Sequence, residues 1–242
     1  PAHGRVDRRL IATAIEPTAG GTRVAIDGDW GRASLDTPLL GRFNAANLLA
    51  VAGAWLALGM DFEVAVTRLG RLRPVPGRLQ AVTLDGLAGP LAVVDYAHTP
   101  DALANALDAL RPVARTRGGR LWCVFGAGGD RDPGKRPLMG AAAEQGADRV
   151  VLTSDNPRSE SPQAILDAIR GGLAAAPAGC EADRALAIAT TLATADPSDV
   201  VLIAGKGHEP YQEIAGVRHP FLDAEHAARA LERRRRREVG GV

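Results

Sequence analysis

The sequence predicts an α/β protein whose larger part is a doubly wound, mainly parallel sheet. Short apolar and β-branched runs alternate with helical segments over most of the chain beyond residue 79. Repeated β-α-β connections of this kind place strands parallel in one sheet, with helices packed against it. Residues 10 to 36 differ, because apolar and polar side chains alternate there between turns rich in glycine and aspartate. That pattern predicts a small antiparallel meander ahead of the parallel sheet.

Composition and charge narrow the class of protein. The chain has 242 residues, of which 46% are hydrophobic, enough for one large domain or two small ones. A formal net charge of +1 gives no overall field toward nucleic acid or a membrane surface. The arginine run Arg233–Arg237 suits the solvated end of a helix, with nucleic-acid contact as the less favoured interpretation. We therefore expect no nucleic-acid and no membrane partner.

Cysteine usage and hydropathy indicate a cytoplasmic protein. Cys123 and Cys180 are far apart and fit neither a disulfide framework nor a metal-binding motif. The longest uncharged apolar run, Ala45–Met60, is too short to span a bilayer. No signal-peptide pattern is present, and the first residue is Pro1 rather than Met. We interpret the chain as a fragment of a cytoplasmic protein.

Two helices are expected after the meander. An Ala/Leu-rich segment that ends near Leu58 predicts a buried helix, and Asp61 can cap a second helix that ends near Leu72. The segment Arg73–Arg78 then holds two prolines and a glycine, which interrupt helical and strand patterns alike. We place a domain boundary in this segment, between residues 76 and 77.

Strands and helices alternate beyond the boundary. The predicted strands are residues 79–84, 91–94, 121–125, 149–153 and 200–204. The first two are expected to form a hairpin around Asp85-Gly86. The predicted helices are residues 100–117, 137–145, 162–174, 183–193 and a last helix that Asp223 caps.

Four of these strands end in polar, turn-prone loops. The loops are Asp95–Pro100, Gly126–Asp132, Asp155–Arg158 and Gly205–Glu209. The carboxyl ends of parallel strands lie at one edge of a sheet, and ligands of open α/β folds bind at that edge. We therefore expect the charged side chains of the four loops to face a common cleft.

The Asp-Asn-Pro-Arg sequence of the third loop suggests the kind of ligand. Pro157 cannot extend the strand and restricts the residue before it, so the chain turns at Asn156. Asp155 and Arg158, three residues apart, can grip an ammonium and a carboxylate, the two ends of an amino acid. The alternative is a surface turn in which Asp155 and Arg158 pair with each other.

The glycine-rich loop is open to more than one interpretation. Gly126–Gly129 is a partial dinucleotide-binding pattern, but Asp130 and Asp132 would repel a pyrophosphate, so a nicotinamide site is disfavoured. Lys135 and Arg136 come just before a helix, where cations oppose the helix dipole. A bound anion would offset that cost; the alternative is a solvated cationic pair.

The last loop and the histidines complete the candidates. Glycines on both sides of Lys206 permit close approach to a ligand, so Lys206 can meet a phosphate or carboxylate and Glu209 an ammonium. Both can equally be ordinary loop charges. His98 and His208 have no Ser or Cys partner at a recognisable spacing, so nucleophilic catalysis is not indicated. No cluster has the spacing of metal ligands.

Six motifs, in this order, resemble the MurE-type Mur ligases over essentially the whole chain. The motifs are Phe43-Asn44-x-x-Asn47, Pro76-Gly77-Arg78, Asp95-Tyr96-Ala97-His98-Thr99-Pro100, Gly128-Gly129-Asp130-Arg131-Asp132-x-x-Lys135-Arg136-Pro137, Asp155-Asn156-Pro157-Arg158 and Gly205-Lys206-Gly207-His208-Glu209. The resemblance implies that residues 1–76 are the C-terminal part of an α/β ATP-binding domain. It implies that residues 77–242 are a Rossmann-like C-terminal domain that binds an amino acid.

The resemblance also implies a reaction and its participants. The family joins meso-diaminopimelate to UDP-MurNAc-L-Ala-D-Glu in peptidoglycan synthesis, with ATP and Mg²⁺, through an acyl phosphate. By resemblance, the nucleotide-binding residues are Asn44, Asn47, Arg78 and Asp95, and the catalytic residues are Arg78, Asp95 and His98. The residues assigned to diaminopimelate are Arg136, Asp155, Asn156, Pro157, Arg158, Gly205, Lys206 and Glu209.

Asp-Asn-Pro-Arg favours diaminopimelate over lysine as the amino acid. Arg158 can bind the distal carboxylate of diaminopimelate bidentately. Lysine lacks this carboxylate, and a site built around a polar group can reject analogues without it by ~10⁴ or more.

The sequence departs from the family by what it lacks. It has no glycine-rich P-loop, none of the upstream magnesium-positioning residues and no uridine-nucleotide domain. We therefore expect no ligase activity from the 242 residues alone. Two alternatives are a non-catalytic relic that binds diaminopimelate or nucleotide, and a folylpolyglutamate synthase-like ligase, a family that lacks Asp-Asn-Pro-Arg.

Overall fold

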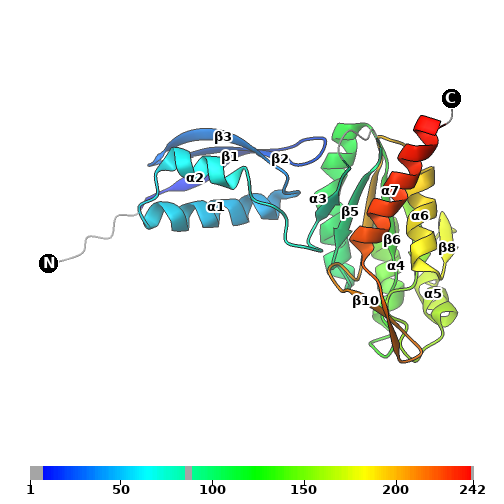
Figure 1. The fold of residues 1–242 in the computed structure, drawn as a ribbon. Coiled ribbons are helices and arrows are strands. Elements are labelled where there is room, and N and C mark those ends of the chain that lie inside the picture. The colour runs from blue at the N-terminus through cyan, green and yellow to red at the C-terminus, as the bar shows by residue number, and fades with distance from the viewer. Residues whose placement is uncertain (1–7, 85–88, 241–242) are drawn as a thin grey trace. The chain divides into compact units, whose positions relative to one another are not determined.

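The computed structural model describes residues 8–84 and 89–240, and it divides into two compact units (Figure 1). The units are Pro1–Arg73 and Pro74–Val242. The division falls within the predicted linker, three residues before the expected boundary. The predicted turn Asp85-Gly86 lies outside the described residues.

The first unit is a three-stranded antiparallel sheet with two helices. Its strands are β1 (Leu10–Pro17), β2 (Thr22–Gly28) and β3 (Gly31–Thr37), in the order β1-β2-β3, so the predicted meander is confirmed. Helix α1 (Arg42–Ala57) and helix α2 (Phe62–Leu69) follow. The Asp61 carboxylate accepts a hydrogen bond from the Val64 N–H and caps α2 as expected. Helix α2 ends at Leu69, three residues earlier than predicted.

The second unit is built on a six-stranded sheet with the order β4-β5-β9-β6-β7-β8. Its strands are β4 (Gln80–Val82), β5 (Leu91–Asp95), β6 (Leu121–Phe125), β7 (Arg149–Thr153), β8 (Gly179–Glu181) and β9 (Val200–Ala204). Strand β4 is an antiparallel edge, and every other neighbouring pair is parallel. The predicted mainly parallel sheet is confirmed. The prediction missed β8, because three residues are too few for a periodic pattern.

Helices cover both faces of this sheet (Figure 1). They are α3 (Pro100–Arg117), α4 (Lys135–Gly146), α5 (Pro162–Arg170), α6 (Arg184–Thr194) and α7 (Asp223–Gly240). Helices α3, α4 and α5 pack in sequence, and α6 packs against α7. Between the sheet and the α6–α7 pair lies a core that includes Val94, Ile188 and Leu231. Strands β5 and β9 are buried along their whole length, which explains their continuous apolar runs.

Helix ends in the second unit differ from the predictions at several places. Helix α4 begins at Lys135 rather than Pro137, so the two cations Lys135 and Arg136 lie inside its first turn. Helix α5 ends at Arg170 rather than Ala174, and two glycines follow it. Asp223 is the first residue of α7, and its carboxylate binds Arg184 of the neighbouring helix.

A hairpin after the last sheet strand was not predicted. Strands β10 (Tyr211–Ile214) and β11 (Val217–Pro220) form a two-stranded antiparallel sheet of their own. Among the described residues, no helix has both the length and the apolar character needed to cross a bilayer.

Candidate functional site

Four loops emerge at one edge of the larger sheet, as expected. Strands β5, β9, β6 and β7 are adjacent and parallel, so the loops that follow them leave from the same edge. Those are the loops that begin at Asp95, Gly205, Gly126 and Ser154.

Asp155 is a buried carboxylate at the end of β7. Asp155 is 8% exposed, and its Oδ1 accepts a hydrogen bond of 2.7 Å from the Asn156 N–H. Burial raises the pKa of the Asp155 carboxyl, and the positive charges of Arg184 and Lys206 oppose that rise. Any residue other than glycine at position 205 would place its Cβ on top of Asp155 Oδ2. The φ of +115° at Gly205 also favours glycine. The two loops therefore depend on each other for their conformation.

Asn156, Lys206 and Glu209 form one hydrogen-bonded cluster. The Lys206 ammonium donates to Asn156 Oδ1 at 3.0 Å and to Glu209 Oε2 at 3.2 Å. The Asn156 amide donates to the same Glu209 oxygen at 2.8 Å. Lys206 is fully buried, whereas the Glu209 side chain is 24% exposed. The buried Lys206 ammonium thus fixes the side chains of Asn156 and Glu209 from the interior side. The second Glu209 oxygen, Oε1, lies 3.5 Å from the Tyr96 hydroxyl.

Arg158 is held in an unusual backbone conformation. Its φ is +53°, a region that costs a non-glycine residue about 1–3 kcal/mol and that is common at functional sites. The hairpin stabilises it, because the Arg158 N–H donates to Glu213 O at 3.0 Å and Arg158 O accepts from the Ala215 N–H at 2.7 Å. The guanidinium Nη1 donates to Gly129 O at 2.6 Å. Arg158 and Asp155 form no ion pair in the described structure, so the alternative of a surface Asp–Arg pair is wrong.

The glycine-rich loop packs closely against this turn. A Cβ on Gly129 would overlap Pro157 O, and a Cβ on Gly128 would lie 2.9 Å from the nearer Nη of Arg158. The Gly129 N–H also donates to Asn156 O at 2.9 Å. These glycines therefore allow the two loops to pack closely. That packing explains why glycine occupies both positions, without a bound dinucleotide.

Arg136 is buried rather than solvated. Arg136 is 4% exposed, and its Nη2 donates to Glu160 Oε1 at 2.7 Å. Its Nε is buried and has no hydrogen-bond partner among the described residues. The alternative of a solvated cationic pair is therefore wrong for Arg136, although Lys135 is partly exposed and donates to His98 O at 3.2 Å. A buried donor without a partner is rare and calls for an explanation such as a ligand or water.

Tyr96, in the loop after β5, lies close to both Arg78 and His98. The Asp95 carboxylate accepts from the Leu79 and Ala97 N–H groups, each at 2.8 Å, and burial raises the pKa of this carboxyl. The Arg78 guanidinium lies 5.0 Å from the centre of the Tyr96 ring. The His98 Nδ1 lies 2.7 Å from Tyr96 O.

Asn44 and Asn47 belong to the first unit. The Asn44 amide donates to Leu40 O at 2.8 Å, and the Asn47 amide lies 3.4 Å from Asn44 Oδ1. They occupy the first two turns of α1.

Sequence reasoning missed the hairpin residues that support the Asp155–Arg158 loop. The Gln212 amide donates to Asp155 O at 2.7 Å, and the Glu213 N–H donates to Asn156 Oδ1 at 3.0 Å. The signal was present: the alternation over Tyr211–Ile214 is followed by Ala215-Gly216 and a second short strand.

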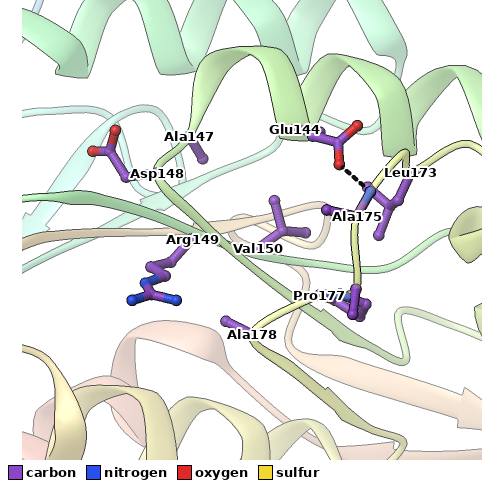
Figure 2. A pocket seen from close by; sticks show the side chains of 10 residues that line it. Glu144, Ala147, Asp148, Arg149, Val150, Leu173, Ala175, Pro177 and Ala178 are labelled. Atoms are coloured by element: carbon purple, nitrogen blue, oxygen red, sulfur yellow. Dashed lines mark hydrogen bonds between the residues drawn. The ribbon is translucent and has the colours of Figure 1, made fainter.

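A pocket of about 150 Å³ lies at the opposite edge of the sheet, where β7 begins (Figure 2). Figure 2 shows the Glu144 carboxylate turned toward the chain at Ala175, away from Arg149. That carboxylate accepts from the Ala174 and Ala175 N–H groups at 2.8 Å each. Its charge therefore anchors a loop, and the pocket contains none of the predicted site residues.

The loop edge combines charges of both signs. Arg136 and Arg158 supply guanidinium groups, and Asp155 and Glu209 supply carboxylates, from two loops and the start of α4. Among the described residues, no group of three or more His, Cys, Asp or Glu side chains could hold a metal ion. Opposite charges at one edge of the sheet suit a ligand that is itself a zwitterion.

Comparison with known proteins gives consistent results. Residues 77–207 match the family model described as Mur ligase, glutamate ligase domain. The chain is 53% identical, over 97% of its length, to the UDP-N-acetylmuramoyl-L-alanyl-D-glutamate–2,6-diaminopimelate ligase of Acidovorax sp. (strain JS42). A solved structure of a ligase with that name has a TM-score of 0.73 and 40% identity over 97% of the chain.

A more distant similarity is to a folylpolyglutamate synthase from Mycobacterium tuberculosis. That structure has a TM-score of 0.57 and 27% identity over 82% of this chain, and the match covers 46% of the synthase. The chain spans about half the length of the diaminopimelate ligases that it matches, 46% of the Acidovorax protein and 47% of the solved structure.

Proposed function

The chain belongs to the Mur ligase family, whose glutamate ligase domain it carries, and we propose that it binds meso-diaminopimelate as the incoming amine of the ligation. The acceptor would be UDP-N-acetylmuramoyl-L-alanyl-D-glutamate. One observation carries this proposal: the loop edge combines an arginine in a strained backbone conformation, Arg158, with two carboxylates, Asp155 on the same loop and Glu209 on the loop after β9. The similarity to diaminopimelate ligases supports it.

The distal end of meso-diaminopimelate matches these groups. It carries one ammonium and one carboxylate, so it needs acceptors and a bidentate donor a few ångströms apart. Arg158 uses Nη1 on Gly129 O, which leaves Nη2 and Nε for a carboxylate. Asp155 and Glu209 can accept from the ammonium, and the Nε of Arg136, which has no partner in the part of the chain that the structure describes, offers a further donor. Pro157 sets the turn that places Asn156 and Arg158.

Binding one end leaves the other amine free to react. That amine attacks the activated D-glutamyl carbonyl, a C–N bond forms, and phosphate leaves with the C–O bond electrons. The amine loses a proton in this step. The residues of this chain contribute by positioning, which can lower the barrier of a two-substrate reaction substantially.

The nucleotide site is proposed from the family resemblance. ATP, when bound, supplies the phosphoryl group that activates the carboxylate. In the second unit, Arg78 would hold its phosphates and Asp95 its ribose. The nucleotide contacts of Asn44 and Asn47, in the first unit, stay predictions from the resemblance. Each Asp95 oxygen already accepts one backbone N–H and keeps a lone pair for a ribose hydroxyl. No group of three or more His, Cys, Asp or Glu side chains among the described residues could hold Mg²⁺ by itself.

A test replaces Arg158 and compares two ligands. In Arg158→Ala, the affinity of the 242-residue chain for meso-diaminopimelate, measured by calorimetry, should fall roughly 10- to 100-fold, because a charge-assisted pair is lost. Affinity for L-lysine should not change. Arg229→Ala, an exposed arginine on α7, is the matched control and should leave both affinities unchanged. Equal affinity of the wild type for the two ligands, or an unaltered Arg158→Ala variant, would count against diaminopimelate.

The two alternatives have less support. Identity to the folylpolyglutamate synthase is 27%, against 53% to the diaminopimelate ligase. No feature of the site favours a relic that only binds, over a domain that serves catalysis.

A further inference from the structure

A buried ion pair lies directly behind the loop edge. Arg184, the first residue of α6, binds Asp223, the first residue of α7, through Nε–Oδ1 at 2.7 Å and Nη2–Oδ2 at 2.8 Å. Both side chains are 0% exposed. A bidentate geometry of this kind holds the guanidinium plane in one orientation.

The rest of the Arg184 guanidinium is used on the two site strands. Nη1 donates to Ser154 O at 3.1 Å, and Nη2 also donates to Ala204 O at 3.0 Å. Ser154 immediately precedes Asp155, and Ala204 immediately precedes Gly205. One side chain therefore fixes the carbonyls at the points where both loops leave the sheet, although β7 and β9 are separated by β6.

Stability alone does not explain this pair. Desolvation of two charges cancels most of their attraction, and buried ion pairs can often be replaced by apolar side chains without loss of stability. A hydrophobic pair would fill the same space between α6 and α7 but would remove the donors that Arg184 gives to Ser154 O and Ala204 O. The orientation of these carbonyls is what the arginine adds.

Arg184 also acts on Asp155 electrostatically. The charged groups around Asp155 are Arg184 from α6 together with Lys206 and Glu209 from the loop after β9. Burial raises the pKa of Asp155, Arg184 is the strongest influence that lowers it, and Glu209 raises it. The bound Asp223 raises the pKa of the Arg184 guanidinium, against the effect of burial.

We propose that Arg184, oriented by Asp223, is a positioning residue of the amine-binding site, which sets the Asp155 and Gly205 loops relative to each other. The proposal rests on the proposed function for its ligand. It assigns to α6 and α7 a role in the site although neither helix contributes a residue to the loop edge.

The test removes the pair while keeping the volume filled. Arg184→Met/Asp223→Leu replaces both partners, and Arg229→Met/Glu225→Leu does the same to an exposed pair on α7 as the matched control. Circular dichroism and a thermal melt establish that each variant folds. The affinity for meso-diaminopimelate at pH 7 should fall at least 10-fold in the first variant and stay unchanged in the control.

A second readout needs no ligand. Carboxyl ¹³C NMR, with Asp155 assigned through Asp155→Asn, should show Asp155 titrating at higher pH in Arg184→Met/Asp223→Leu than in the wild type. If the variant does not fold, Arg184→Lys replaces it; the ammonium keeps the charge but cannot reach all three acceptors, so affinity should still fall.

The outcomes separate the two proposals. A folded variant with wild-type affinity and wild-type Asp155 titration overturns the role of Arg184. A wild type that does not bind meso-diaminopimelate overturns the proposed function, while the ligand-free titration of Asp155 still decides whether Arg184 acts on the loop.

Discussion

Gly205→Ala should destabilise the fold and displace the Asp155 carboxylate. Gly205 has a φ of +115°, and an added Cβ would overlap the Asp155 carboxylate. The backbone conformation costs an L-residue about 1–3 kcal/mol, and overpacking of a buried site adds about 1–3 kcal/mol. We expect a loss of roughly 2–4 kcal/mol after relaxation, which lowers Tm by roughly 5–15 °C in a domain of this size.

The loss of affinity should exceed what strain alone explains. Displacement of Asp155 removes a charge-assisted hydrogen bond to the ligand ammonium, worth about 1.5–3 kcal/mol, or roughly 10- to 100-fold in Kd. The matched control is Gly118→Ala at the end of α3, where φ is +71° and nothing lies within 4 Å of the added Cβ. Calorimetry should find weaker meso-diaminopimelate binding in Gly205→Ala only. Equal affinities in both variants would refute the coupling between the Gly205 and Asp155 loops.

The raised pKa of Asp155 gives two further predictions. In the folded state, Asp155 holds its proton to higher pH than in the unfolded chain, so its contribution to the unfolding free energy is lost as pH rises through the folded pKa. Asp155→Asn should therefore raise Tm at pH 7 by a few degrees (roughly 2–4 °C per kcal/mol). The same variant should bind diaminopimelate at least 10-fold more weakly. A lower Tm at pH 7 would contradict a raised pKa of Asp155 in the folded state. Affinity of the wild type should also fall as pH drops through the Asp155 pKa, and a calorimetric series from pH 7 to pH 4 that shows no such fall would argue against a carboxylate acceptor.

The parallel sheet was predictable from the sequence because four of its strands, β5, β6, β7 and β9, are mostly buried. Runs such as Val200–Ala204 have no polar position to obscure them, and their ends coincide with the observed strands. The strand ends then identify the loop edge, because parallel strands deliver their loops to one side. Asp155 and Arg158 could be found in this way.

The support of the site was harder to predict. Arg184 is distant from Asp155 in sequence, and nothing in the local pattern distinguishes it from an exposed helix-start arginine. The same holds for Lys206, whose loop suggests a surface charge but whose side chain is fully buried. Such contacts depend on how helices pack across a sheet, which hydrophobic periodicity does not encode. The hairpin Tyr211–Pro220 was missed because its strands have four residues each.

The central claim is that the four-loop edge binds the distal end of meso-diaminopimelate. An amide NMR titration of the 242-residue chain tests it most directly, with L-lysine as the matched ligand that lacks only the distal carboxylate. We predict that meso-diaminopimelate shifts the amides of Gly128, Asn156, Arg158 and Gly205 at concentrations where lysine leaves the Arg158 amide unmoved. Shifts that fall elsewhere on the chain, or equal responses to both ligands at Arg158, would contradict the account.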